Sequence, residues 1–225
     1  MLFRSAVEFF RYQIFKIQGS SPATRFGNNV HNAIRLINNK MAGPDNFEGE
    51  VKKAVENMIL ATEELKKQFP GLDFLSDKSE QTLAMPLQDL IAYSGTPMEF
   101  NGKMDAVFKH DKGILIVDYK TDINNRDSAK HKRQLAAYKK MYSKLFNEPE
   151  HKISTCVMFV ALRGGVNTGK FDCELDFGKR DVFSTFEEHL LKIIGWKQDP
   201  QSFINELVGQ LDDTPLNLSI KQKLA

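Results

Sequence analysis

The segment from Gly102 to Asp122, GKMDAVFKHDKGILIVDYKTD, constrains the fold more than any other part of the chain. Two mainly apolar runs flank the polar pair Asp111-Lys112, and this pattern predicts two strands joined by a tight turn. Side chains alternate along a strand, so Asp118 and Lys120 share one face. That face is apolar where the second strand begins and charged where it ends.

The turn decides which residues face each other. If Asp111 and Lys112 form a two-residue loop, Asp105 lies opposite Asp118. Cross-strand neighbours have Cβ atoms about 4.5–5.5 Å apart, so two half-buried carboxylates at that spacing repel each other. A cation between them relieves this cost, and paired carboxylate oxygens suit Mg²⁺ or Mn²⁺. Lys120 can reach the same pocket with its ammonium group.

A different turn leads to a different prediction. A three-residue loop that uses Gly113 in the left-handed region competes with the two-residue loop. A one-residue slip moves Asp105 to the opposite face of the sheet. In that case the metal argument fails, and both carboxylates are solvated residues at strand ends.

Apolar periodicity and Gly/Pro breaks divide the rest of the chain into helices and strands. Helical spacing predicts helices over 2–17, 24–41, 47–69, 128–146, 180–196 and 201–211. In the second of these, one apolar stripe contains Phe26, Val30, Ala33, Ile37 and Met41. Shorter alternating or apolar runs predict strands over 80–93, 98–110, 113–120, 153–162 and 170–177, with an irregular tail after 211.

Strands flanked by helices predict an α/β or α+β fold with a mixed sheet. The length of 225 residues suits one domain over 1–225. Within it we expect a mainly helical region over 1–78, a sheet core over 79–178, and C-terminal helices with a tail over 179–225.

Composition limits the class of protein without naming a function. The 31 Lys and Arg residues nearly balance the 29 Asp and Glu residues, so net charge does not predict a nucleic-acid partner. Only Cys156 and Cys173 are present, which is too few for a four-cysteine zinc or iron–sulfur site and fits a reducing compartment. No apolar run reaches about 18 residues, and the N-terminus lacks the pattern of a signal peptide. We therefore expect a cytoplasmic protein without a membrane partner.

Four short motifs in a fixed order resemble those of the PD-(D/E)xK nuclease superfamily. More narrowly, they resemble the RecB-type nuclease domain that is attached to superfamily 1 helicases. The motifs are Phe26-Gly27-x-x-Val30-His31, Gly102-x-x-Asp105, Val117-Asp118-Tyr119-Lys120-Thr121 and Gln134-Leu135-x-x-Tyr138. The resemblance implies a restriction-endonuclease-like core with an N-terminal helical region.

The same resemblance implies roles for individual residues. Mg²⁺ or Mn²⁺ would be held by His31, Asp105, Asp118 and the backbone carbonyl of Tyr119. Lys120 would position the attacking water and stabilise charge on the phosphate, which agrees with the electrostatic needs of phosphodiester hydrolysis. Gln134 and Tyr138 would shape the site from the following helix.

The implied activity is hydrolysis of DNA, on single strands or ends, in repair or recombination. The implied partner is a helicase motor in the same chain or in a second one. Two other interpretations stay open, namely a module that binds DNA or a partner without catalysis, and a nuclease that acts on RNA. No iron–sulfur cluster is expected, because the cysteines that hold it in some relatives are missing.

Several residues carry two interpretations from the sequence alone. His31 is either a metal ligand or a structural histidine, and Tyr138 is either a site residue or part of the core. Glu80 and Glu99 either approach the metal or lie exposed at strand edges. A basic run either contacts phosphates or forms a solvated helix face; its residues are Lys130, His131, Lys132 and Arg133, followed by Lys139 and Lys140.

A glycine-rich segment before Lys170 nearly matches a phosphate-binding P-loop. That motif requires Ser or Thr after the lysine and then a helix. Phe171 follows instead, and the next residues alternate as in a strand. We therefore predict a hairpin turn here and no bound nucleotide.

Overall fold

The computed structural model describes residues 21–124, 128–164, 167–176, 182–211 and 222. The chain forms two compact units, and Ser21–Phe183 make up the larger one. The smaller unit includes Ser184 and the residues that follow it. The helix predicted over 2–17 lies outside the described residues, as does nearly all of the tail after 211.

A five-stranded mixed sheet forms the centre of the larger unit, in the order β1-β4-β5-β6-β7. Strands β5 and β6 are parallel, whereas the other neighbours are antiparallel. A parallel pair needs a crossover connection, and helix α5 lies between these two strands in the chain. The strands are β1 (Asp73–Phe74), β4 (Ala106–His110), β5 (Gly113–Lys120), β6 (Ile153–Gly164) and β7 (Asn167–Asp176). The prediction of a mixed sheet flanked by helices is confirmed.

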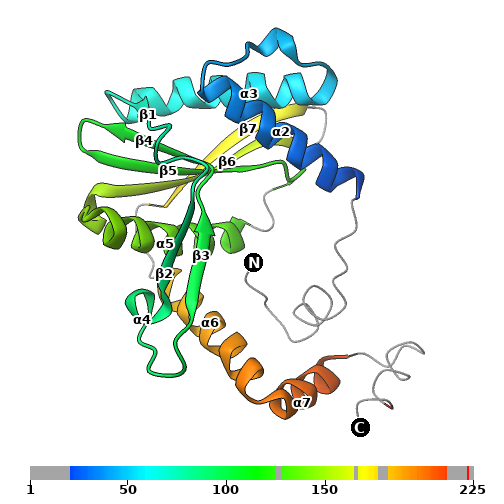
Figure 1. Cartoon of the computed structure of the whole chain (residues 1–225). Helices are drawn as coiled ribbons and strands as arrows, with labels where there is room; N and C mark the ends of the chain where they lie inside the picture. Colours follow the sequence, from blue (N-terminus) through cyan, green and yellow to red (C-terminus); the bar gives the residue numbers. More distant parts are fainter. Residues whose placement is uncertain (1–20, 125–127, 165–166, 177–181, 212–221, 223–225) are drawn as a thin grey trace. The chain divides into compact units, whose positions relative to one another are not determined.

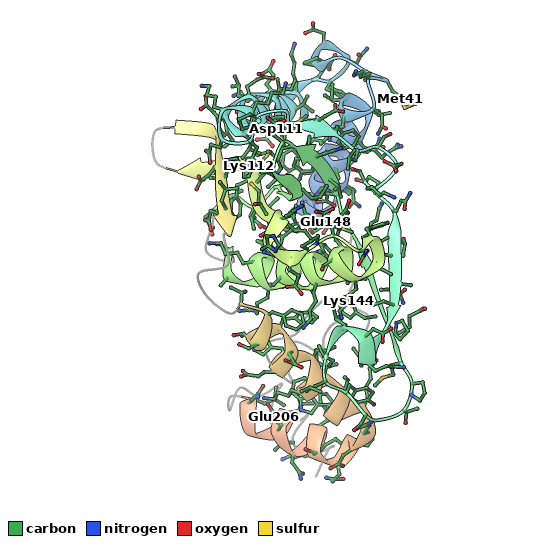
Figure 2. The ribbon with its side chains drawn as sticks, turned by 90° about the vertical axis from the view of Figure 1, so that its left-hand side faces the viewer. Met41, Asp111, Lys112, Lys144, Glu148 and Glu206 are labelled. Atoms are coloured by element: carbon green, nitrogen blue, oxygen red, sulfur yellow. The ribbon has the colours of Figure 1, made fainter. Side chains whose placement is uncertain are left out.

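The turn between β4 and β5 settles the register question. His110 pairs with Gly113 and Ala106 pairs with Val117, so Asp111 and Lys112 form a two-residue loop. Figure 2 labels both turn residues. The two-residue alternative is confirmed and the three-residue loop is wrong.

Helices cover both faces of this sheet, as Figure 1 shows. Helices α2 (Pro22–Asn38) and α3 (Gly49–Gln68) cover one face, and α5 (Ser128–Phe146) covers the other. Alternation along β5 sends its odd-numbered residues into the core with α2 and α3. This core includes Leu115, Val117 and Tyr119 from β5 together with Val30 and Met58 from the helices.

Helix α2 begins and ends with identifiable caps. At its start, the Ser21 hydroxyl accepts a hydrogen bond from the Thr24 N–H, and Pro22 follows the cap. At its end, Lys40 adopts a left-handed backbone with φ of 57°, and the Met41 N–H reaches the Leu36 carbonyl.

The stripe predicted to include Met41 was therefore too long. The helix ends at Asn38, so Met41 leaves the apolar face and is 70% exposed (Figure 2). The C-cap ends the helix at Asn38, although the apolar periodicity of the sequence continues to Met41.

Two of the predicted strands are divided. The run over 80–93 becomes β2 (Thr82–Pro86) and the short helix α4 (Leu87–Leu90). The run over 98–110 becomes β3 (Glu99–Lys103) and β4, which lie in different sheets. Strands β2 and β3 form a separate antiparallel pair (Figure 1). The break between β3 and β4 falls at Met104-Asp105, where the chain changes sheets.

The remaining predicted elements are confirmed: β5 and α5 have the predicted bounds, and the others have shifted ends. Strands β6 and β7 pair antiparallel, and the residues after Lys170 continue as a strand, so the helix of a P-loop does not follow. In the C-terminal part, Asp199 caps α7 (Pro200–Gln210), and α6 (Val182–Gln198) packs Trp196 against Phe203 of α7. Short 3₁₀ turns occur at Pro44–Asn46 and Glu150–Lys152. No helix in the described part of the chain is both long and apolar enough to cross a membrane.

Candidate active site

The last residues of β5 carry a buried ion pair. Asp118 and Lys120 follow the apolar residues Ile114 and Ile116 on the strand face that α5 covers. Asp118 is only 3% exposed, and its Oδ2 lies 2.7 Å from Lys120 Nζ. Burial raises the pKa of Asp118, although the nearby Lys120 ammonium acts against this rise. Burial also acts to lower the pKa of Lys120, but Asp118 outweighs it and the net shift is upward.

Asp105 stands just beyond the last pair of the β4–β5 ladder. The register that pairs Ala106 with Val117 would continue to Asp105 and Asp118. Asp105 has left the strand, however, and its Oδ2 accepts a hydrogen bond of 2.9 Å from the Tyr119 N–H. Its negative charge still acts on Asp118, whose pKa it raises after the larger effects of burial and Lys120. The two carboxylates are thus electrostatic neighbours, as the hairpin register predicts.

His31 approaches the same carboxylate from α2. Its Nδ1 lies 3.5 Å from Asp105 Oδ2, and its side chain is one third exposed. Burial acts to lower the pKa of His31, but the hydrogen bond and charge of Asp105 outweigh it, and the net shift is upward. Helix α2 therefore brings His31 next to Asp105, although the two residues are far apart in the sequence. This proximity is what the predicted role of His31 as a metal ligand requires.

Tyr119 connects these elements through three of its groups. Its N–H donates to Asp105, its ring lies edge-on to His31 with centroids 6.5 Å apart, and its hydroxyl accepts from Asn38 Nδ2 at 3.1 Å. The side chain is 2% exposed, and burial raises its pKa, so the phenol stays protonated. Asn38 had no sequence signal of a site role, because its partner is 81 residues away.

Helix α5 contributes the predicted pair Gln134 and Tyr138. Gln134 Nε2 donates to the Tyr138 hydroxyl at 2.8 Å, and Tyr138 is 7% exposed. Burial raises the pKa of Tyr138, whereas the Gln134 hydrogen bond and the Lys103 backbone oppose the rise, and Asp118 and Asp105 add to it. Tyr138 is therefore both a core residue and a neighbour of the acidic pair, which combines the two interpretations.

The basic run at the start of α5 is largely engaged within the fold. Lys132 Nζ lies 3.0 Å from Glu174 Oε2 on β7, and the Ser128 hydroxyl bonds to the same oxygen. Lys130 and Arg133 also interact with other groups of the chain. Lys139 is half-buried on the same helix. The run is thus not a simple solvated face, and a phosphate at Lys132 would compete with Glu174.

The two glutamates considered as extra ligands have ordinary environments. Glu80 has a left-handed backbone with φ of 59°, precedes β2, and forms an ion pair with Lys103. Its N–H donates to the Met104 carbonyl, which brings its backbone next to the break before Asp105. Glu99 is exposed on β3. The prediction that Glu80 begins a strand was wrong.

One pair of side chains near the site was missed from the sequence. Asp122 Oδ2 lies 2.8 Å from His131 Nε2, and His131 packs edge-on to Phe159 with ring centroids 6.1 Å apart. His131 had been considered only as part of the basic run. Its spacing of three residues from Gln134 on one helix was the available signal.

The donor groups suit a divalent cation, but they are not gathered around one. Asp118 Oδ2 is buried and, within the part of the chain that is described, has no hydrogen bond of good geometry in addition to its ion pair. Asp105 adds a carboxylate oxygen, the ligand type that Mg²⁺ and Mn²⁺ prefer, and His31 adds an imidazole nitrogen beside it. No group of three His, Cys, Asp or Glu side chains in the described residues could hold a metal ion as placed. The chemistry of the donors fits a metal, and their present positions favour the ion pair.

A five-stranded mixed sheet with helices on both faces is consistent with a restriction-endonuclease-like fold. A sequence model of the PD-(D/E)XK nuclease superfamily matches residues 4–199. The chain belongs to this superfamily. No curated protein matches the chain. Members of the superfamily are typically nucleases that use divalent metal ions.

Proposed function

We propose that this chain is a nuclease that hydrolyses DNA phosphodiester bonds with Mg²⁺ or Mn²⁺. The observation that carries the proposal is the buried Asp118 carboxylate, which lies 2.7 Å from Lys120 Nζ and within the electrostatic influence of Asp105. Burying two acidic groups and one ammonium group costs free energy of folding, so packing alone does not explain their presence. They match the needs of phosphodiester hydrolysis, in which anionic charge increases on the phosphate.

The proposed roles follow from the position of each group. Asp105, Asp118, His31 and the Tyr119 carbonyl would hold the metal, which when bound supplies a nucleophilic water near neutral pH and a Lewis acid. Lys120 would orient the attacking water and place a fixed positive charge beside the phosphate.

Residues of α5 would bind the substrate on the same side of the sheet. Gln134 and Tyr138, held together by their hydrogen bond, would contact its backbone. A further set on α5 would contact neighbouring phosphates: Lys130, Lys132, Arg133 and Lys139. Such contacts are independent of base sequence and weaken with salt.

The biological setting is proposed from the resemblance of the motifs to RecB-type domains. We propose action on single strands or DNA ends during repair or recombination, with a helicase motor in the same or a partner chain. The free thiols of Cys156 and Cys173 support a cytoplasmic location.

A second candidate is a module that binds DNA without cutting it. Two observations favour it. Lys120 forms an ion pair with the Asp118 carboxylate, and no three His, Cys, Asp or Glu side chains among the described residues are placed to bind a metal ion. A bound cation would have to displace this ion pair.

A cleavage assay separates these two functions. Labelled single-stranded DNA, duplex DNA with free ends and single-stranded RNA are incubated with the chain and Mg²⁺ or Mn²⁺. Asp118→Ala and Lys120→Ala should each lower the DNA cleavage rate by about a hundredfold or more. Asp111→Ala and Lys112→Ala are matched controls, because these exposed residues form the turn at the far end of β5.

Each outcome has a definite meaning. Cleavage that survives both site substitutions would show that the chemistry lies elsewhere. No cleavage by the parent, together with salt-sensitive DNA binding, would favour the second candidate. Faster cleavage of RNA than of DNA would show that RNA, and not DNA, is the preferred substrate.

A further inference from the structure

The chain leaves β5 with a third carboxylate close to the site lysine. Asp122 is two residues beyond Lys120, and its side chain is 46% exposed. The hydrogen bond from His131 lowers the pKa of Asp122, and the positive charge of Lys120 contributes to the same shift. Lys120 therefore lies within electrostatic range of three carboxylates: the buried Asp118, Asp105 and the more exposed Asp122. Of these, Asp118 pairs with it and Asp122 is the more solvated alternative.

Asp118 and Asp122 differ in how much hydration the Lys120 ammonium loses when it pairs with them. Beside Asp118, whose side chain is 4% exposed, Lys120 is itself only 18% exposed and loses most of its hydration. Beside Asp122, the ammonium would keep more of its water. An unengaged Asp122 would thus compete for Lys120 and draw it away from the position that the proposed chemistry requires.

His131 engages Asp122 in the present structure. Its Nε2 lies 2.8 Å from Asp122 Oδ2, and its side chain is only 12% exposed. The ring is held edge-on to Phe159, which pairs with Lys120 in the register of β5 and β6. His131 therefore stands on a packed helix beside Lys120, with the competing carboxylate bound to it.

We propose that His131 is a positioning residue that binds Asp122 and so keeps Lys120 paired with Asp118. The catalytic consequence rests on the proposed nuclease function, whereas the effect on Lys120 itself does not. Lys130 also acts electrostatically on Asp122, so it is the other cation that a released Asp122 could bind.

Substitutions at both members of the pair test this role. His131→Phe keeps an aromatic ring against Phe159 but cannot bond Asp122, and it should lower the DNA cleavage rate about tenfold. That loss corresponds to nine in ten molecules having Lys120 beside Asp122. His131→Gln, whose amide can still donate to Asp122, should retain most of the rate.

The double variant separates positioning from a general loss of structure. Asp122→Asn alone should cleave at the parent rate, and Asp122→Asn combined with His131→Phe should return to within about twofold of it. If His131 only stabilises the fold, removing Asp122 will not restore the rate, and the proposal is overturned. His151→Phe, at an exposed position on the Glu150–Lys152 turn, controls for the new aromatic side chain.

A second measurement does not depend on cleavage. Limited acetylation of the metal-free protein, read by mass spectrometry, reports the accessibility of Lys120, with the exposed Lys112 as internal reference. Lys120 should react several-fold faster in His131→Phe and at the parent rate in the double variant. If the parent cuts no nucleic acid, the proposed function fails while this footprint still decides the role of His131.

Unchanged Lys120 reactivity in His131→Phe would overturn the proposal, and so would lowered reactivity of Lys130 instead. If His131→Phe does not fold, His131→Leu replaces it in both measurements. The expected and overturning results are then the same.

Discussion

Replacing Gly102 by alanine tests how closely β3 and α5 must approach at the site. A Cβ atom at this position would lie 2.6 Å from Tyr138 Cε1, 3.2 Å from Cδ1 and 3.3 Å from Met141 Sδ. Carbon atoms in ordinary contact are about 3.5–4.0 Å apart, so the Tyr138 ring would have to move by about 1 Å. Tyr138 is 7% exposed, so the ring has little free space to enter.

Two costs and one gain determine the change in the free energy of unfolding. Forcing extra volume into a packed region costs about 1–3 kcal/mol in the free energy of unfolding. A 1 Å shift would also stretch the 2.8 Å bond between Gln134 and Tyr138, and a lost hydrogen bond costs about 0.5–1.5 kcal/mol. Alanine restricts the unfolded chain, which returns about 0.4–1 kcal/mol. The net loss is about 2 kcal/mol, equivalent to a fall in Tm of roughly 4–8 °C.

Thermal unfolding and DNA cleavage measure the two consequences of Gly102→Ala. We expect the lower Tm together with a reduced cleavage rate, because Tyr138 and Gln134 move as a pair. Gly195→Ala is the matched control, since its added Cβ in α6 has no atom within 4 Å and alanine favours a helix. A variant Gly102→Ala with the parent's Tm and rate would refute the claim that this close approach positions Tyr138.

Three further predictions concern other parts of the larger unit. Burial lowers the pKa of His110, whose Nε2 has no hydrogen-bond partner in the described residues. The contribution of this histidine to stability should therefore be constant above about pH 6.5 and fall as the pH decreases below that value, by up to about 1.4 kcal/mol per pH unit. Urea unfolding at pH 7 and pH 5 should show a smaller difference for His110→Phe than for the parent. Asn57 donates from buried Nδ2 to the Val160 carbonyl at 2.9 Å, so Asn57→Ala should cost about 1–3 kcal/mol in urea unfolding, and a change under 0.5 kcal/mol would contradict this estimate. A Cβ on Gly27 would lie 3.2 Å from Thr121 Oγ1, so Gly27→Ala should push α2 away from the end of β5 and reduce the cleavage rate severalfold. Adding Thr121→Ala to this variant should restore the rate, and failure to restore it would show that this contact is not the cause.

Local pattern predicted the hairpin well because its determinants are local. The period of two in the apolar runs and the two-residue Asp111-Lys112 loop fix which residues face each other. With a two-residue loop, one of the two turns that the sequence left open, the same rules place Asp105 beside Asp118. Helices α3 and α5 were likewise predicted because long amphipathic periods leave few alternatives.

The errors occurred where local pattern was overruled. Apolar alternation continues through Met104, yet the chain changes from one sheet to another there, and the Glu80 N–H bonds to the Met104 carbonyl. The stripe on α2 continues to Met41, yet the cap at Lys40 ends the helix first. Periodicity describes which face is apolar, but it does not say where the backbone turns.

By itself, the sequence determined the class of fold, the two strands of the hairpin and the candidate site residues Asp105, Asp118 and Lys120. These depend on alternation and on contacts between near neighbours in the chain. Only the tertiary structure decided which partners those groups have: His31 with Asp105, Asn38 with Tyr119, His131 with Asp122 and Glu174 with Lys132. The first, second and fourth of these join segments more than 40 residues apart, whereas the third depends on how α5 returns over the sheet. Packing of helices on the two faces of the sheet brings all four pairs together, and these tertiary contacts cannot be predicted from spacing in the sequence.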